Sequence, residues 1–251
     1  MNTLNENLRL EYLDAMDIQL WLPRASTAVS NFNSKDRPDP EIRVLDENSA
    51  AVLGTLPDAP EIPSQDQWQD LERRVASCTS CELHKTRTQT VFGTGSRTAK
   101  WMVIGEAPGQ SEDEQGKPFV GRAGQLLTEM LRAVGLDRKE VFIANILKCR
   151  PPGNRDPKPD EVACCDGFLN QQVAMVRPKI ILAVGRIAAQ NLLKTDAPIG
   201  RLRGRVHRYR DIPLVVVYHP AYLLRSPLEK RKAWEDLQLA MHTIESGENE
   251  Y

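Results

Sequence analysis

Four short apolar runs recur along the chain after residue 100, and each gives way to polar residues, glycine or proline. These runs cover 101–104, 141–146, 179–184 and 214–217. Runs of this length bounded by turn residues are typical of buried strands. Segments with helix-like spacing lie between or after them, near 123–134, 160–176, 186–194 and 228–245. The alternation predicts an α/β fold, a three-layer αβα sandwich with a central, mostly parallel four-stranded sheet.

The N-terminal region differs in composition. Residues 6–24 have helix-like apolar spacing that ends in the apolar patch Leu20–Leu22, whereas 25–65 is rich in Ser, Asn, Asp and Pro. The second composition is typical of a linker. We therefore expect an N-terminal extension and Pro-rich linker over 1–65 and a globular domain over 66–251. The apolar patch gives the extension a means of docking on the core or on an unidentified protein partner.

Bulk properties fit one globular domain with an extension: the 251 residues are 41% hydrophobic and 27% charged. No apolar run approaches the roughly 18 residues that cross a bilayer. The N-terminal residues alternate charged and apolar side chains and lack the continuous apolar region of a signal peptide. We expect a cytoplasmic monomer without membrane contact. Because the net charge is -1, nucleic-acid binding would need local patches. Arg201–Arg210, with five arginines and one histidine, is either such a patch or a solvated strand pair.

Five cysteines follow a spacing that suggests a metal site. Cys78 and Cys81 form a C-x-x-C turn after a predicted helix at 66–76, and Cys149 opens a Pro-rich loop. Cys164 and Cys165 are neighbours on the next predicted helix, so only one of them faces the same point as the other three. Disulfides are disfavoured in the cytosol. Four thiolates suit zinc and an iron–sulfur cluster equally.

Three chemically active side chains fall where predicted strands end. Glu106 follows the first apolar run, Asn145 lies near the end of the second, and His219 follows the fourth. Ligands of parallel α/β sheets bind at the carboxyl ends of the strands. With the aromatic Phe119 nearby, the pattern predicts a pocket for a flat, polar group on which chemistry is performed. Glu112 and Asp113 are rival carboxylates.

These segments together resemble the family 4 uracil-DNA glycosylases, bacterial and archaeal enzymes that carry a [4Fe–4S] cluster. The matching pieces are C-x-x-C, GEAPG-x-x-ED-x-x-G-x-PFVG-x-AG-x-LL, N-x-x-KCRPPGNR, the downstream cysteine and HPAYLLR, in order between about 66 and 245. A related class that attaches covalently to uracil has a KRRIH insertion near the third cysteine. This chain has CRPPGNRDPKPDE at that point, which disfavours that class.

The resemblance implies a DNA-repair hydrolase that flips uracil out of DNA and cleaves its N-glycosidic bond, leaving an abasic site. It assigns catalysis to Glu106 and His219, ring stacking on uracil to Phe119, and reading of the O4/N3 edge to Asn145. The backbone of Gly105, Glu106 and Ala107 would complete the uracil site.

The resemblance also assigns the cofactor and the DNA contacts. Cys78, Cys81, Cys149 and Cys165 would bind the [4Fe–4S] cluster, leaving Cys164 as a packing residue. Contact with uracil-containing DNA would come from the segment after His219: Leu223 and Leu224 as candidate wedges, and Arg225 on phosphate. Two alternatives are a non-catalytic iron–sulfur DNA-binding protein on the same scaffold and a zinc-stapled nucleotide-binding module.

Overall fold

The computed structural model describes residues 63–248, and the predictions for the N-terminal extension lie outside them. Within this range the chain alternates strands and helices. The strands are β1 (Thr94–Gly95), β2 (Trp101–Gly105), β3 (Phe142–Asn145), β4 (Ile180–Val184), β5 (Val206–Tyr209) and β6 (Ile212–Val217). The helices are α2 (Gln65–Ala76), α3 (Gln110–Gln115), α4 (Arg122–Ala133), α5 (Pro159–Val176), α6 (Arg186–Leu193), α7 (Ile199–Leu202), α8 (Pro220–Arg225) and α9 (Lys230–Glu248). Three single 3₁₀ turns are η1 (Glu82–Lys85), η2 (Pro152–Asn154) and η3 (Pro227–Glu229).

The strands form one sheet in the order β1-β3-β2-β4-β6-β5. The four predicted strands are its parallel centre, β3-β2-β4-β6, and the α/β class is confirmed. The predicted number of strands was wrong, because β1 and β5 add antiparallel edges. β1 is only two residues long, and β5 is the half-exposed, arginine-flanked segment VHRY. Neither has the continuous apolar run that marks a buried strand.

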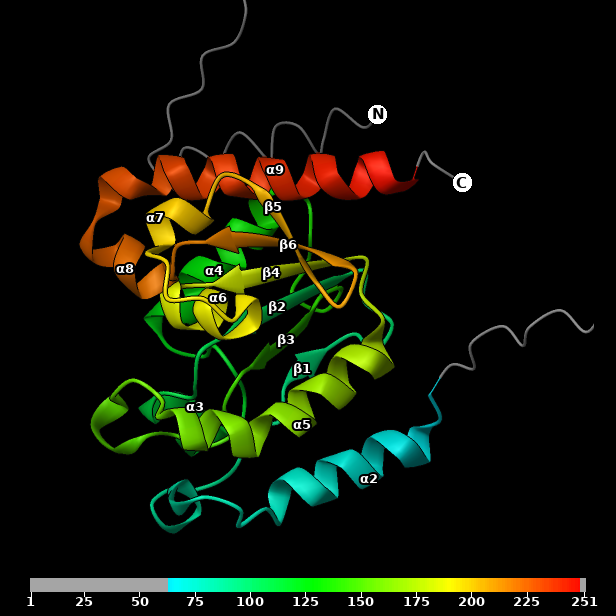
Figure 1. The fold of residues 1–251 in the computed structure, drawn as a ribbon, viewed down its shortest axis with the longest axis vertical. Helices are drawn as coiled ribbons and strands as arrows, with labels where there is room; N and C mark the ends of the chain where they lie inside the picture. The colour runs from blue at the N-terminus through cyan, green and yellow to red at the C-terminus, as the bar shows by residue number, and fades with distance from the viewer. Residues whose placement is uncertain (1–62, 249–251) are drawn as a thin grey trace, which may run out of the picture. The chain divides into compact units, whose positions relative to one another are not determined.

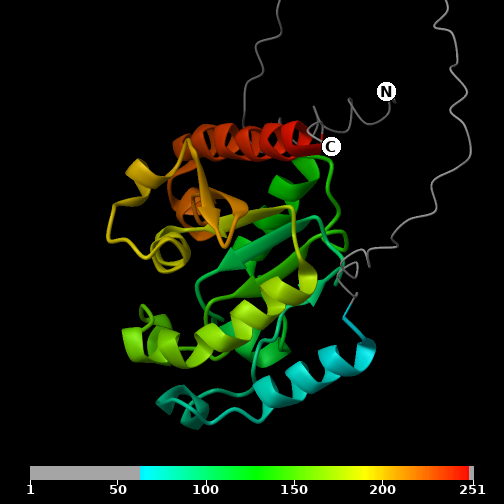
Figure 2. The ribbon, with the colours of Figure 1, turned by 45° about the vertical axis from the view of Figure 1, so that its right-hand side comes forward.

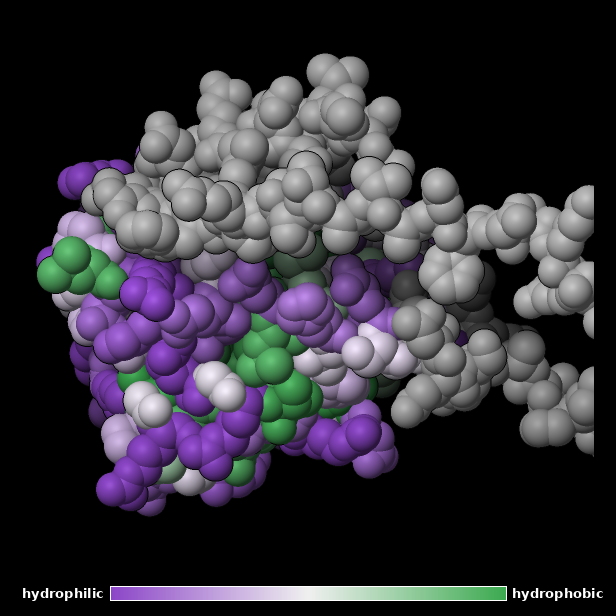
Figure 3. All heavy atoms as spheres, turned by 90° about the horizontal axis from the view of Figure 1, so that it is seen from above, coloured by the Kyte–Doolittle hydropathy of each residue, from purple (hydrophilic) through white to green (hydrophobic). Residues whose placement is uncertain are grey.

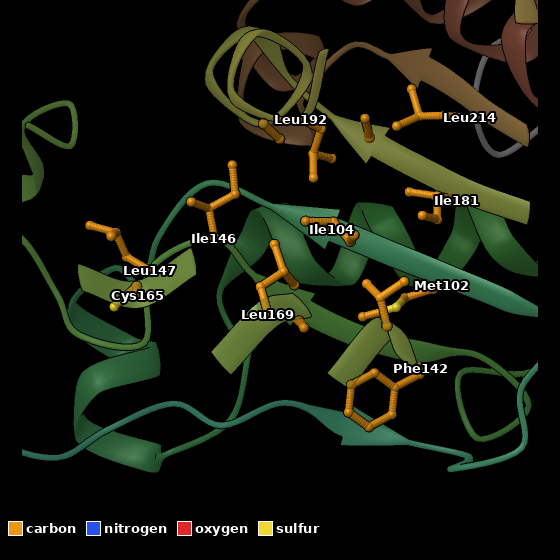
Figure 4. Close-up of a cluster of buried hydrophobic side chains, with 14 of the residues drawn as sticks. Met102, Ile104, Phe142, Ile146, Leu147, Cys165, Leu169, Ile181, Leu192 and Leu214 are labelled. Atoms are coloured by element: carbon orange, nitrogen blue, oxygen red, sulfur yellow. The ribbon is translucent and has the colours of Figure 1, made fainter. Parts of the chain in front are cut away.

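Helices cover both faces of the sheet (Figures 1 and 2). One face carries Met102, Ile104 and Phe142, and these pack in a cluster with apolar residues of α2, α5 and α6. Figure 4 shows part of this cluster, with Leu169 of α5 among the strand side chains. The other face packs against α4, α8 and α9. Burial on both faces explains why β2 and β4 are apolar at every position.

The chain path brings the strand ends together. The chain runs from β2 through α4, on one face of the sheet, to β3, which is one neighbour of β2. From β3 it runs through α5, on the opposite face, to β4, which is the other neighbour of β2. Such a reversal of strand order leaves a crevice at the carboxyl end of the sheet. Gly105 pairs in register with Asn145, so Glu106 begins its loop beside the end of β3.

None of the helices within residues 63–248 combines the length and the apolar character that a bilayer crossing requires.

Candidate active site

A cavity of about 420 Å³ opens at the carboxyl edge of the sheet. Its lining includes six of the predicted site residues, which come from the ends of three strands and the loops that follow: Glu106, Ala107, Phe119, Asn145, His219 and Arg225. Gly105 is not part of this lining and lies directly behind it. The structure therefore brings the three strand-end side chains and the aromatic ring into one pocket.

Close packing around Gly105 brings the reading amide and the stacking ring together. A Cβ atom at residue 105 would lie 2.5 Å from Oδ1 of Asn145 and 2.6 Å from Cζ of Phe119. At Gly124, on the first turn of α4, a Cβ atom would lie 1.8 Å from the carbonyl oxygen of Phe119. Phe119 itself has a positive φ of 52°, which is uncommon for a residue with a side chain. Both glycines thus permit the backbone and side-chain placement of Phe119.

Asn145 presents an unused hydrogen-bond acceptor. The residue is 2% exposed, and its Oδ1 atom is buried without a hydrogen-bond partner among the described residues. Buried polar atoms are nearly always paired, because an unpaired one loses its bonds to water without replacement. An N–H group of a ligand in the cavity would satisfy this oxygen.

His219 is held in one orientation and one tautomer. The backbone N–H of Ala221 donates to Nδ1 at 3.1 Å, so the proton of the neutral ring resides on Nε2. The ring stacks on Phe119, with 5.7 Å between centroids and 28° between planes. Burial, reinforced by the positive charge of Arg225, lowers the pKa of His219 to about 4. At neutral pH the imidazole is therefore an uncharged hydrogen-bond donor.

The rival carboxylates Glu112 and Asp113 both accept backbone N–H groups, whereas the Glu106 carboxylate has no such bond among residues 63–248. Glu112 accepts backbone N–H groups from Val120 at 2.9 Å and Gly109 at 3.1 Å, which closes the loop that carries Phe119. Asp113 is 2% exposed and accepts the N–H of Thr88 at 3.0 Å. Both rivals thus hold backbone in place.

The environment of Glu106 suits proton chemistry near neutral pH. Burial raises the pKa of its carboxyl to about 7, with a further contribution from Asp156 that Arg186 opposes. Asp156 and Arg186 form an ion pair of 2.7 Å between the loop after β3 and the start of α6. A carboxyl group with a pKa near the working pH is suited to general acid–base catalysis.

The predicted DNA-contacting segment divides into a buried and an exposed part. Leu223 is 1% exposed and packs in the core with residues of α4 and α9, which corrects its prediction as a wedge. Leu224, one position further along α8, is 39% exposed, and Arg225 lines the cavity. Consecutive helical residues point in different directions, so only one of the two leucines faces solvent.

The arginine-rich segment Arg201–Arg210 covers the end of α7, the turn that follows and strand β5, which pairs with β6. Arg203 points inward and pairs with the fully buried Asp236 at 2.9 Å, so it is not available to phosphate. Arg201, Arg205 and Arg208 are exposed. Hydrophilic side chains also cover most of the described part of the face in Figure 3.

The cysteines gather from three segments, after α2, after β3 and on α5. Cys149 and Cys165 are buried in the same core cluster, against which Cys81 also packs. Figure 4 labels Cys165 within this cluster. Burial raises the pKa of the Cys165 thiol to about 11, and the neighbouring Cys149 and Cys81 add to the effect. Cys164 is exposed and donates to the carbonyl oxygen of Ser80 at 3.3 Å. Within residues 63–248, no three potential ligands converge closely enough to hold a single metal ion.

Sequence reasoning missed one wall of the cavity. Pro151, Asn154 and Arg155, in the loop that Cys149 opens, also line it. Arg155 forms an ion pair with the buried Glu161 at the start of α5. The signal was present in the motif N-x-x-KCRPPGNR, but no property of the sequence indicates that this loop folds over the strand ends.

Comparison with known proteins identifies the family. The family model described as Uracil DNA glycosylase superfamily matches residues 92–238. A type-4 uracil-DNA glycosylase of Archaeoglobus fulgidus is 46% identical over 166 residues, 63% of this chain and 83% of that protein. Those of Pyrobaculum aerophilum and Thermotoga maritima are 41% and 40% identical, and the matches cover 68% and 69% of this chain and 91% and 93% of theirs.

The chain therefore belongs to the uracil-DNA glycosylase superfamily, and within it to the type-4 enzymes. It is a DNA-repair hydrolase that cleaves an N-glycosidic bond, which confirms the family and the enzyme class predicted from the motifs.

Proposed function

We propose that this chain excises uracil from DNA in the cavity at the carboxyl edge of the sheet, with the residues already named acting on a flipped nucleotide. The observation that carries the proposal is the unpaired Oδ1 atom of Asn145, buried at the wall of the cavity beside Phe119. A glycosidic bond inside a stacked duplex is out of reach, so the nucleotide must leave the stack, at a cost of a few kcal/mol.

Asn145 distinguishes uracil from cytosine. Its Oδ1 accepts the N3–H of uracil and its amide NH₂ donates to O4. Cytosine presents the reverse pattern, an unprotonated N3 and an amino group at C4. A fixed amide would therefore place two acceptors opposite each other at N3 and two donors opposite each other at C4. Phe119 stacks on the flat ring. The backbone from Gly105 to Ala107 completes the cradle.

His219 and Glu106 stabilise the two charges that bond cleavage creates. When the bond between C1′ and N1 breaks, its electron pair leaves with the base as a uracil anion, and the sugar becomes oxocarbenium-like. His219, neutral and protonated on Nε2, donates to O2 and favours the anion. Ionised Glu106 stabilises the sugar and accepts a proton from the water whose oxygen bonds to C1′.

Leu224 and Arg225 act on the DNA. Leu224 is exposed on α8 beside the cavity lining, where an apolar side chain can fill the gap left by the flipped base. Arg225 lies between the cavity and solvent and pairs with phosphate, which makes binding dependent on salt.

Cys78, Cys81, Cys149 and Cys165 would hold a [4Fe–4S] cluster. A cluster spaces its thiolates more widely than a single ion does, so the lack of a single-ion site among the described residues is compatible with one. Cys149 and Cys165 are buried in one core cluster and Cys81 packs against it, which supports a shared centre. Arg87 donates to Sγ of Cys149 at 3.1 Å. Hydrolysis transfers no electrons, so the cluster's part is to shape the loop after Cys149.

The decisive experiment incubates purified full-length protein with a single-uracil oligonucleotide and scores alkali-labile sites. We expect cleavage of the uracil strand and none of a matched cytosine strand. The variant Glu106→Gln/His219→Ala, purified in parallel, controls for contaminating glycosylases. Tight binding of uracil DNA without abasic-site formation would favour the non-catalytic alternative. An absorbance shoulder near ~400 nm separates an iron–sulfur protein from a zinc protein.

A further inference from the structure

Lys148 is a fully enclosed lysine close to the uracil-reading residue. It is 1% exposed, and its Nζ atom donates to the backbone carbonyl of Asn145 and to Oε1 of Gln172, each at 2.7 Å. An amine offers two N–H groups in either protonation state, so both bonds persist whether or not it is charged. The carbonyl that receives the first bond belongs to the last residue of β3.

Gln172 extends this contact to two other segments. It is 0% exposed on α5, and its Nε2 donates to the carbonyl oxygen of Phe92 at 2.8 Å. The backbone carbonyl of Lys148 accepts the N–H of the neighbouring Val91, also at 2.8 Å. Lys148 therefore joins the end of β3 to α5 and to the segment before β1.

We propose that Lys148 is a positioning residue for uracil recognition: by holding the backbone carbonyl of Asn145, it fixes the direction in which the Asn145 amide meets the base. This inference rests on the proposed function of Asn145. The Oδ1 atom of that amide has no partner among the described residues, so its aim depends on the backbone that carries it. Preorganisation of this kind affects catalysis strongly, because small misplacements of a recognising group lower the rate.

Stability alone does not account for a lysine at this point. Removing an ammonium group from water is costly, and an apolar side chain of similar volume often packs as well or better. Lys148 is buried and bonded to Asn145 at the end of β3 and to Gln172 of α5. Its chain neighbour Leu147 and Leu169 of α5 belong to the apolar core cluster (Figure 4). Its two short hydrogen bonds fix geometry, and their loss is expected to appear in recognition.

A double-mutant cycle with Asn145→Ala tests the proposal. In single-turnover cleavage of uracil DNA by the full-length holoenzyme, we expect Lys148→Met to lower the rate roughly tenfold in the parental background. In the Asn145→Ala background, followed over long incubations, it should lower the rate by no more than about twofold, because the group it positions is absent. Inhibition by free uracil should weaken in Lys148→Met, while binding to DNA with an abasic site stays within about twofold of the parental protein.

Two further variants keep the test decisive. Gln172→Met removes one of the two bonds that hold the Lys148 amine, so it is the variant to use if Lys148→Met does not fold. We expect a smaller rate loss than for Lys148→Met, and this loss should again nearly disappear in the Asn145→Ala background. Asp236→Asn disrupts a buried ion pair elsewhere and should combine additively with Asn145→Ala. Additive losses for both Lys148→Met and Gln172→Met, or unchanged inhibition by uracil, would overturn the positioning role. A parental protein that does not cleave uracil DNA would instead refute the proposed function.

Discussion

Phe119 and His219 stack against each other with 5.7 Å between their ring centroids, although Phe119 lies in the loop between α3 and α4 and His219 follows β6. This contact joins the two loops that carry most of the cavity. Together with the bond from the Ala221 N–H to Nδ1, it holds the imidazole in place at the cavity wall.

Replacing His219 with Ala should slow cleavage more than it weakens binding. The proposed bond from Nε2 to O2 strengthens as the uracil anion forms, so its loss falls on the transition state. We expect a decrease of roughly 10²–10³ in the single-turnover rate and a much smaller change in affinity for uracil DNA. His242→Ala, on the exposed side of α9, is the matched control. A parental rate for folded His219→Ala would remove His219 from the mechanism.

Replacing Asn145 with Asp should weaken uracil excision and shift specificity. A carboxylate cannot donate to O4, but it accepts from the amino group of cytosine. Loss of one buried hydrogen bond should cost ~1–3 kcal/mol in the ground state, with weak activity gained on a cytosine oligonucleotide. Rates on matched uracil and cytosine strands measure the change. If the variant kept the parental preference and rate, Asn145 would not be the reading residue.

The rate of cleavage should depend on the ionisation of Glu106. Because burial raises the pKa of Glu106 to about 7, its carboxylate form is lost as pH falls through that value. The single-turnover rate should therefore fall about tenfold per pH unit below pH 7. His219, with its pKa near 4, contributes no change above pH 5. Glu106→Gln should cleave slowly at every pH, and its rate should not fall below pH 7 in this way. If the rate of this variant still fell about tenfold per pH unit below pH 7, another group would be responsible for the pH dependence.

Glu106→Gln should also be more stable than the parental protein at pH 8. The folded-state pKa of Glu106 lies above its ordinary value of 4.5, so the unfolded chain loses this proton first. Parental stability therefore falls as pH rises from 4.5 to 7, and the neutral amide avoids this loss. Allowing for solvent screening at a partly exposed site, we expect a gain of ~1–2 kcal/mol at pH 8 and little difference at pH 4.5. Denaturant unfolding at both pH values measures it, and equal stability at pH 8 would contradict the buried charge.

The adjacent cysteines of α5 should respond differently to substitution. Cys165 is buried beside Cys149, whereas Cys164 is exposed and bonded to the Ser80 carbonyl. We expect Cys164→Ala to retain iron and the absorbance near ~400 nm, and Cys165→Ala to lose both. Iron analysis of the two purified variants measures this difference. Loss of iron in Cys164→Ala and its retention in Cys165→Ala would make Cys164 the ligand in place of Cys165.

Much of the architecture followed from the sequence because its signals are local. Apolar runs bounded by glycine, proline and polar residues predicted β2, β3, β4 and β6, since a strand buried on both faces has no polar positions. The same reasoning placed Glu106, Asn145 and His219 at strand ends, where parallel strands deliver their ligands. The edge strand β1 was not predicted, because an edge needs neither length nor an apolar run, whereas β5 lies in the segment for which a solvated strand pair was one of two interpretations.

Other features were decided only by tertiary packing. Leu223 and Leu224 are adjacent residues of the same type, so the sequence does not distinguish them. The packing of α8 against α4 and α9 buries Leu223 and leaves Leu224 exposed. Arg203 is one of five nearby arginines, and the position of Asp236 on α9 alone turns it inward. Glu106 and Glu112 differ because the folded loop after β2 turns its own backbone N–H groups, those of Gly109 and Val120, onto Glu112. Composition and spacing describe what each residue can do, whereas burial and partners, which long-range contacts set, determine what it does.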